Sequence, residues 1–269
     1  MVLCPRSITR ADLLFIIIMK SQTNLIERLF ASGAHFGFKK SRRHPTVTPY
    51  LFATKDGSDI FDLEKTAGSI AEVTALLEEA GKQGKVVLFV STKDEMSRLV
   101  KDTAEKVGQP YVVNRWIGGM LTNWSEIKKR IYRLESLISE KESGELERKY
   151  TKKERVLLNR EADKLQFNFG GIKSCTKIAD MMVVVDPRHD SIAVTEANEM
   201  GLPVVAIMSS DCDASKVQYP IVVNDALQSS VAIVLSELAT AFQNGKALYV
   251  PKPAAPRTDT RPRRPRTEA

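Results

Sequence analysis

The sequence predicts a doubly wound α/β domain, a parallel sheet with helices on both faces, interrupted by an antiparallel helical hairpin. Short, unbroken apolar runs recur along the chain with amphipathic segments between them. Strands of a parallel sheet are buried on both faces, so they read as continuous apolar runs. Two apolar stripes with helical spacing on either side of Gly144 predict the hairpin.

A β-hairpin and a helix are expected first. Residues 50–54 and 59–63 read as strands, and Asp56-Gly57 between them tolerates the positive φ of a tight turn. Residues 64–81 then form an amphipathic helix with one apolar face: Ile70, Val73, Leu76 and Leu77.

The alternating part of the chain follows. Its expected strands are 86–90, 111–113, 181–185, 204–208 and 221–223, and its expected helices are 94–107, 191–200 and 226–242. Because strands and helices alternate, the sheet is parallel and covered on both faces.

The helical hairpin is expected between the second and third strands of this sheet. Its first stripe is Ile127, Ile131, Leu134 and Ile138, and its second is Leu158, Ala162, Leu165 and Phe169. Segment 125–168 holds twelve Lys/Arg and nine Asp/Glu, a net charge of +3. The alternative interpretation is a solvated helix pair without a partner.

The chain therefore divides into four expected parts. Residues 1–22 are an extension, disordered or not native, because translation could begin at Met19. Residues 23–124 and 169–245 form the α/β domain, 125–168 the hairpin, and 246–269 a basic, proline-rich disordered tail. Residues 251–269 contain five prolines and carry a net charge of +4, with almost no apolar side chain to bury.

The positive net charge of the chain predicts an anionic partner. The net charge of the 269 residues is +7, and segments 125–168 and 251–269 together account for all of it. The remainder is neutral overall, although it contains a dense cluster: Lys39, Lys40, Arg42 and Arg43. Four cations in five residues are expected to bind phosphate.

Segment 114–124, NRWIGGMLTNW, is the strongest candidate for a contact surface. It joins Arg115 and Trp116 to a double glycine, Gly118 and Gly119, and to a helix start that Thr122 or Asn123 can cap. Free amides at a helix start favour phosphate. The competing interpretation is an ordinary strand-to-helix turn around a buried tryptophan.

Nothing in the sequence favours an enzyme, a membrane protein or a secreted protein. No glycine-rich phosphate loop follows the strand 86–90, and no histidine accompanies a nucleophile motif. The apolar run 13–19 is too short to span a bilayer. Three cysteines far apart in the sequence fit a reducing compartment, and no cofactor or small-molecule substrate is expected.

Metal binding is not expected either. The weak candidates for a metal site are His35, Asp211 and Asp213. Alone, His35 is more typical of a hydrogen-bonded structural histidine.

An ordered series of motifs resembles one family, the S-two family of small-subunit ribosomal proteins. The motifs are SGAHFG at 32–37, PYLF at 49–52 followed by DLEKT at 62–66, KVVLFVSTK at 85–93, RWIGGMLTN at 115–123, GGIK at 170–173, VVDP at 184–187, EAN at 196–198, GLPVVAI at 201–207 and YPIVVND at 219–225. The resemblance runs from about residue 25 to 242. The chain departs from it at 209–214, SSDCDA, at Ala226, and at Phe38, where some members have a histidine.

The resemblance implies a flavodoxin-like fold with the projecting hairpin of bacterial-type members. It implies a structural constituent of the small subunit, binding ribosomal RNA and neighbouring proteins, including the large S-one protein. The residues expected at RNA are Lys39, Lys40, Arg42, Arg43, Arg115, Trp116, Gly118, Gly119, Asn123, Lys128 and Lys129. The expected location is the cytoplasmic ribosome, with an organelle as the alternative. The competing function is a free RNA-binding or scaffold protein on the same fold.

Overall fold

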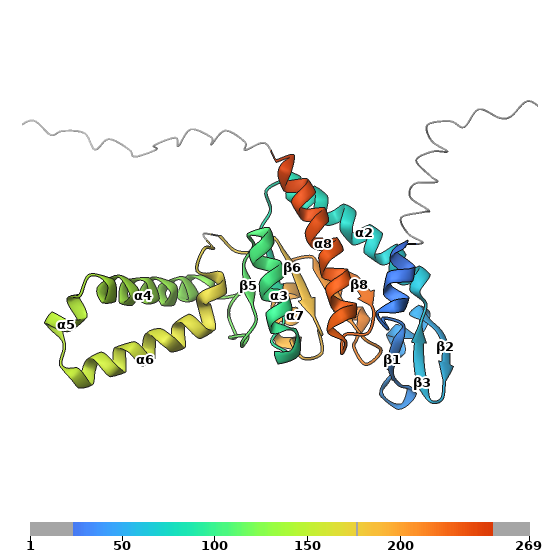
Figure 1. Ribbon diagram of the computed structural model, residues 1–269, viewed down its shortest axis with the longest axis horizontal. Coiled ribbons are helices and arrows are strands. Elements are labelled where there is room, and N and C mark those ends of the chain that lie inside the picture. Colours follow the sequence, from blue (N-terminus) through green and yellow to red (C-terminus); the bar gives the residue numbers. More distant parts are fainter. Residues whose placement is uncertain (1–23, 176, 250–269) are drawn as a thin grey trace, which may run out of the picture.

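The computed structural model describes residues 24–175 and 177–249 of the chain. Figure 1 shows a central body with the helical hairpin projecting from one end and a small antiparallel sheet at the other. The expected extension 1–22 and residues 251–269 of the basic tail lie outside the described residues. In the part that is described, no helix has both the length and the apolar character needed to cross a membrane.

A parallel five-stranded sheet forms the centre of the body, as the apolar runs predict. Its strands are β4 (Val87–Val90), β5 (Tyr111–Val112), β6 (Met181–Val185), β7 (Val204–Met208) and β8 (Tyr219–Val222). The order is β5-β4-β6-β7-β8, the flavodoxin-like order in which the second strand lies outside the first. Every residue of β4, β6 and β7 is buried.

Helices cover both faces of this sheet. They are α2 (Leu63–Lys82), α3 (Asp94–Val107), α7 (Ser191–Glu199) and α8 (Gln228–Ala247), and residues 24–31 are also helical. Val87 and Phe89 belong to the core beneath α2, α3 and α8, whereas Leu88 and Val90 belong to the core beneath α7 and the hairpin root. The last helix runs to Ala247, past the predicted end of the domain at 245, and Lys246 Nζ donates to the Val107 carbonyl at 3.0 Å.

The hairpin consists of two long helices and a short one at the tip. These are α4 (Trp124–Glu142), α5 (Glu145–Lys149) and α6 (Lys152–Phe169). The predicted stripes pack together, but Leu137 and Leu146 are also buried, whereas Ile138, Leu158 and Ala162 are only partly covered. The sequence did not predict α5.

The three-stranded antiparallel sheet holds the predicted β-hairpin. Strands β2 (Leu51–Lys55) and β3 (Ser58–Phe61) pair around Asp56 and Gly57, whose φ angles are 51° and 76°. Strand β1 (Phe36–Lys39), which no sequence pattern predicts, pairs with the other edge of β3. This sheet presents the basic cluster 39–43 at the end of the molecule away from the hairpin (Figure 1).

Candidate nucleic-acid interface

A buried glutamate shapes the loop between β5 and α4. Glu196, on α7, is 7% exposed. Its Oε1 accepts hydrogen bonds from Trp116 Nε1 at 3.1 Å and from the Gly119 amide at 2.8 Å. Its Oε2 accepts from the Leu121 amide at 3.1 Å and lies within 3.5 Å of the Thr122 amide and hydroxyl. A carboxylate that receives several amide donors is a strong anchor for a loop.

Trp116 is part of the interior, which corrects the prediction that it meets RNA. The residue is 8% exposed, and its indole packs in the core beneath the hairpin root while donating to Glu196. No free ring face remains for a base. Trp124 is half-buried and packs against the same core, so only Trp116 adopts the buried alternative fully.

The two glycines of this loop have different roles. Gly119 has a φ of 90°, and a Cβ there would lie 3.2 Å from Asn123 Cβ, so its own backbone requires glycine. Gly118 has no such φ, and nothing lies within 4 Å of the position its Cβ would take. Asn123 precedes α4 without a capping hydrogen bond from its side chain, which corrects the expected cap. Gly118, Asn123 and Arg115 are all exposed.

The basic cluster 39–43 presents three cations to solvent, not four. Lys39, Lys40 and Arg42 are exposed, and the Arg42 guanidinium lies 5.1 Å from the centre of the Phe38 ring. Arg43 instead turns inward, where its Nε is 3.5 Å from the carboxylate of the fully buried Asp59. A buried carboxylate needs this cation, so the expectation that Arg43 binds phosphate is corrected.

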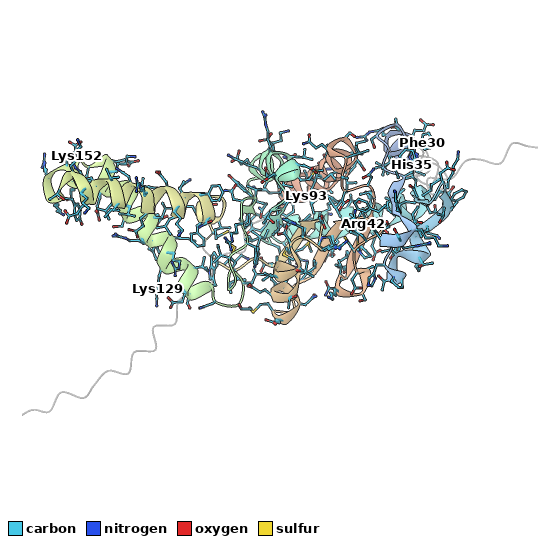
Figure 2. The ribbon with its side chains drawn as sticks, turned by 90° about the horizontal axis from the view of Figure 1, so that it is seen from below. Phe30, His35, Arg42, Lys93, Lys129 and Lys152 are labelled. Atoms are coloured by element: carbon cyan, nitrogen blue, oxygen red, sulfur yellow. The ribbon has the colours of Figure 1, made fainter. Side chains whose placement is uncertain are left out.

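The hairpin carries more cations than its carboxylates neutralise. Lys129 pairs with Glu126 at 2.6 Å on an exposed surface, a pair too weak to withhold the ammonium from a phosphate. Lys128 is half-buried beside it. Among the described residues of the hairpin, eight cations have no carboxylate within 4.0 Å: Lys128, Arg130, Lys141, Arg148, Lys152, Lys153, Arg160 and Lys164. Figure 2 shows Lys129 and Lys152 at separate points along the hairpin, and Arg42 far from both.

A second charged cluster lies at the carboxyl ends of the parallel strands. The ligand atoms of Asp186, Cys212 and Asp225 lie within 4.8 Å of one another, and Lys93 Nζ lies 3.5 Å from Asp186. Burial alone would lower the pKa of Lys93, but the carboxylates of Asp225 and Asp186 outweigh it and raise that pKa. Burial and the nearby carboxylates raise the pKa of the Cys212 thiol, so it stays protonated and is a poor metal ligand.

The residues predicted as weak metal candidates are not those that gather at this cluster. Asp211 accepts from Arg188 Nη1 at 2.6 Å, and Asp213 accepts from the Ser215 amide and hydroxyl at 3.0 and 2.7 Å. The sequence alone did not reveal that the carboxylates of Asp186 and Asp225 lie close together in the fold. Of the two carboxylates in the cluster, Asp186 already pairs with the Lys93 ammonium.

The similarity of this chain to known proteins covers most of the fold. The model of the family described as Ribosomal protein S2 matches residues 29–245. The chain belongs to the ribosomal protein S2 family. The match includes both the loop that Glu196 anchors and the whole hairpin.

Several relatives of this S2 family chain carry names of small-subunit proteins. The small ribosomal subunit protein uS2 of Picosynechococcus sp. is 39% identical over 221 residues, covering 82% of this chain and 86% of that protein. The uS2c protein of Emiliania huxleyi is 37% identical over 221 residues, covering 82% of this chain and 96% of its own. The uS2 protein of Wolinella succinogenes is 40% identical over 220 residues, with 82% and 81% covered.

In this S2 family chain His35 is structural, but stacking rather than hydrogen bonding holds it. Its ring lies 4.5 Å from that of Phe30, nearly parallel, and 4.0 Å from that of Phe36. Its Nδ1 is buried and has no hydrogen-bond partner. Burial lowers the pKa of His35, so the ring is neutral at neutral pH and remains a stacking element.

Proposed function

We propose that this protein is a structural component of the small ribosomal subunit, where it binds ribosomal RNA and neighbouring ribosomal proteins by contact and without catalysis. The observation that carries the proposal is the family match over residues 29–245. The small-subunit names of relatives about 38% identical support it. The protein is accordingly placed on ribosomes, in a cytoplasm or an organelle.

The distribution of free cations supports an RNA-binding role. Lys39, Lys40 and Arg42 form one exposed group, and the hairpin holds another that its own carboxylates leave unneutralised. Lysine and arginine at phosphates release condensed counterions, which makes affinity fall with salt. An RNA partner neutralises both groups at once, whereas a neutral protein surface would leave them unpaired.

The experiment measures how two triple variants bind to small subunits that lack this protein. Each variant loses three positive charges. Changing Lys39, Lys40 and Arg42 to alanine should weaken binding and lower the salt slope by roughly two, because each phosphate contact contributes about 0.7–0.9. Arg43 stays in place because it pairs with Asp59. The control replaces Lys82, Lys85 and Lys106, exposed cations at the ends of α2 and α3. Equal effects of the two variants would remove loop 39–42 from the RNA contact.

Co-sedimentation separates the proposed function from the competing one. A tagged chain should travel with small subunits through a gradient, whereas a free RNA-binding or scaffold protein stays at the top. The proposed contact with the S-one protein is tested in the same gradient: S-one should leave the subunits when this chain is absent. Exposed Phe30, Phe36 and Phe52, on and beside the antiparallel sheet, offer apolar surface for such a protein contact.

A further inference from the structure

A groove lies where the loop after β5 meets the root of the hairpin. Its volume is about 570 Å³, within the range of roughly 300–1,000 Å³ typical of small-molecule sites. Ile127, Leu165 and Phe169 line it and are themselves buried, so they form its floor. The groove is therefore apolar at the bottom and open to solvent above.

The charged groups that line the groove, taken with the cations paired to its carboxylates, carry a net positive charge. Glu126 and Glu161 line it, but Lys129 lies 2.6 Å from the first and Arg133 lies 3.3 Å from the second. Arg130 and Lys164 also line the groove. Among the described residues, neither of these two has a carboxylate within 4.0 Å. Four cations thus meet two carboxylates, which favours an anionic occupant.

Amide groups and bare backbone complete the walls. Asn123 and Asn168 line the groove, and each amide offers both donors and an acceptor. Gly118 lines it as well, with nothing within 4 Å of the position of a Cβ. A flat ring can therefore approach the backbone at Gly118 closely.

We propose that this groove takes one unpaired nucleotide of RNA, with its base on the apolar floor against Gly118 and its phosphate at Arg130 and Lys164. An apolar floor suits the face of a base, amides suit its edge, and cations suit its phosphate. This inference rests on the proposed RNA-binding function and adds the position and chemical form of one contact.

The test fills the groove without removing charge. Gly118→Leu places an apolar side chain in the open space, and the matched control Gly68→Leu does the same on α2, where nothing lies within 4 Å either. Binding is measured on small subunits that lack this protein. Gly118→Leu should bind on the order of tenfold more weakly, the effect of losing one stacked base, with an unchanged salt slope. Gly68→Leu should bind like the unmodified chain.

A second variant and a structure of the assembled subunit distinguish loss of binding at the groove from a folding defect. Changing Arg130 and Lys164 to glutamine alters only exposed side chains and should both weaken binding and lower the salt slope. A map of the assembled subunit should show an unstacked base over Gly118. A protein side chain in that place, or Gly118→Leu binding as tightly as Gly68→Leu, would overturn the inference alone. If the unmodified chain does not bind subunits at all, the proposed function fails with it.

Discussion

Glu196 and Asp225 are both buried carboxylates, but they differ in the groups that surround them. Glu196 accepts hydrogen bonds from the indole of Trp116 and from the amides of Gly119 and Leu121. Asp225 is 1% exposed, and its Oδ1 has no hydrogen-bond partner. Burial first, and then the negative charge of Asp186, raise the pKa of Asp225 to about 7, while Lys93 opposes the shift.

The difference separates two uses of a buried acid. The donors around Glu196 come from one loop, so the carboxylate fixes the shape of that loop and of the groove beside it. The neighbours of Asp225 are other charged groups, so its energy depends on pH rather than on backbone geometry.

Removing the Glu196 carboxylate should have the largest effect on stability. Glu196→Ala leaves the buried donors of Trp116, Gly119 and Leu121 without an acceptor, and each unpaired group costs about 1–3 kcal/mol. We expect a loss of about 3–5 kcal/mol in the free energy of unfolding, measured by urea denaturation. Glu199→Ala, an exposed site on the same helix, should change it by less than about 0.5 kcal/mol. Similar losses in both variants would mean that Glu196 does not anchor the loop.

Replacing Asp225 should change how stability depends on pH. Between about pH 4 and pH 7 folded Asp225 keeps a proton that the unfolded chain has released, because its pKa rises from 3.8 to about 7. The free energy of unfolding therefore falls as pH rises through this window. Three pH units correspond to at most about 4 kcal/mol.

Asp225→Asn should remove the contribution of this proton to the fall in the free energy of unfolding. The variant therefore gains stability relative to the unmodified chain as pH rises from 4 to 7. Thermal unfolding at several pH values measures the difference. Asp190, whose pKa burial also raises, still titrates in both proteins, so it cancels in the comparison. Parallel pH profiles would show that Asp225 ionises normally.

Gly119→Val tests the loop that Glu196 holds, with a smaller expected effect. A branched side chain at a φ of 90°, 3.2 Å from Asn123 Cβ, should cost about 1–3 kcal/mol. The geometry therefore predicts a lower melting temperature for this variant. Gly118→Val should melt like the unmodified chain. If both variants melt alike, the loop does not have the conformation described.

The parallel sheet and the long helices could be predicted because their determinants are local. Strands β6 and β7 coincide with the expected apolar runs, and α3 begins and ends as expected at Asp94 and Val107. Burial on both faces leaves a continuous apolar signal in the sequence. In contrast, β1 is short and lies at an edge of its sheet, and it pairs Phe36 with Ile60. No pattern in the neighbouring sequence therefore predicts a strand there.

The candidate site was harder to predict because its decisive contacts are distant in sequence. Trp116 and Glu196 are 80 positions apart, and the only sequence signal for the glutamate was its place in the EAN motif. Arg43 looked like its basic neighbours until the structure placed buried Asp59 beside it. Charge counts cannot separate a cation that faces solvent from one that neutralises the interior.

The exposed cations of loop 39–42 and those of the hairpin lie at opposite ends of the long axis of the molecule (Figure 1). If RNA contacts both ends, as proposed, release of one end leaves the other bound, and the first contact re-forms before the protein diffuses away. Two modest affinities then combine as avidity and lengthen the residence time without any new contact. The body acts as a spacer of fixed length, so the gain is available only to an assembled partner whose two phosphate surfaces stand at that same separation.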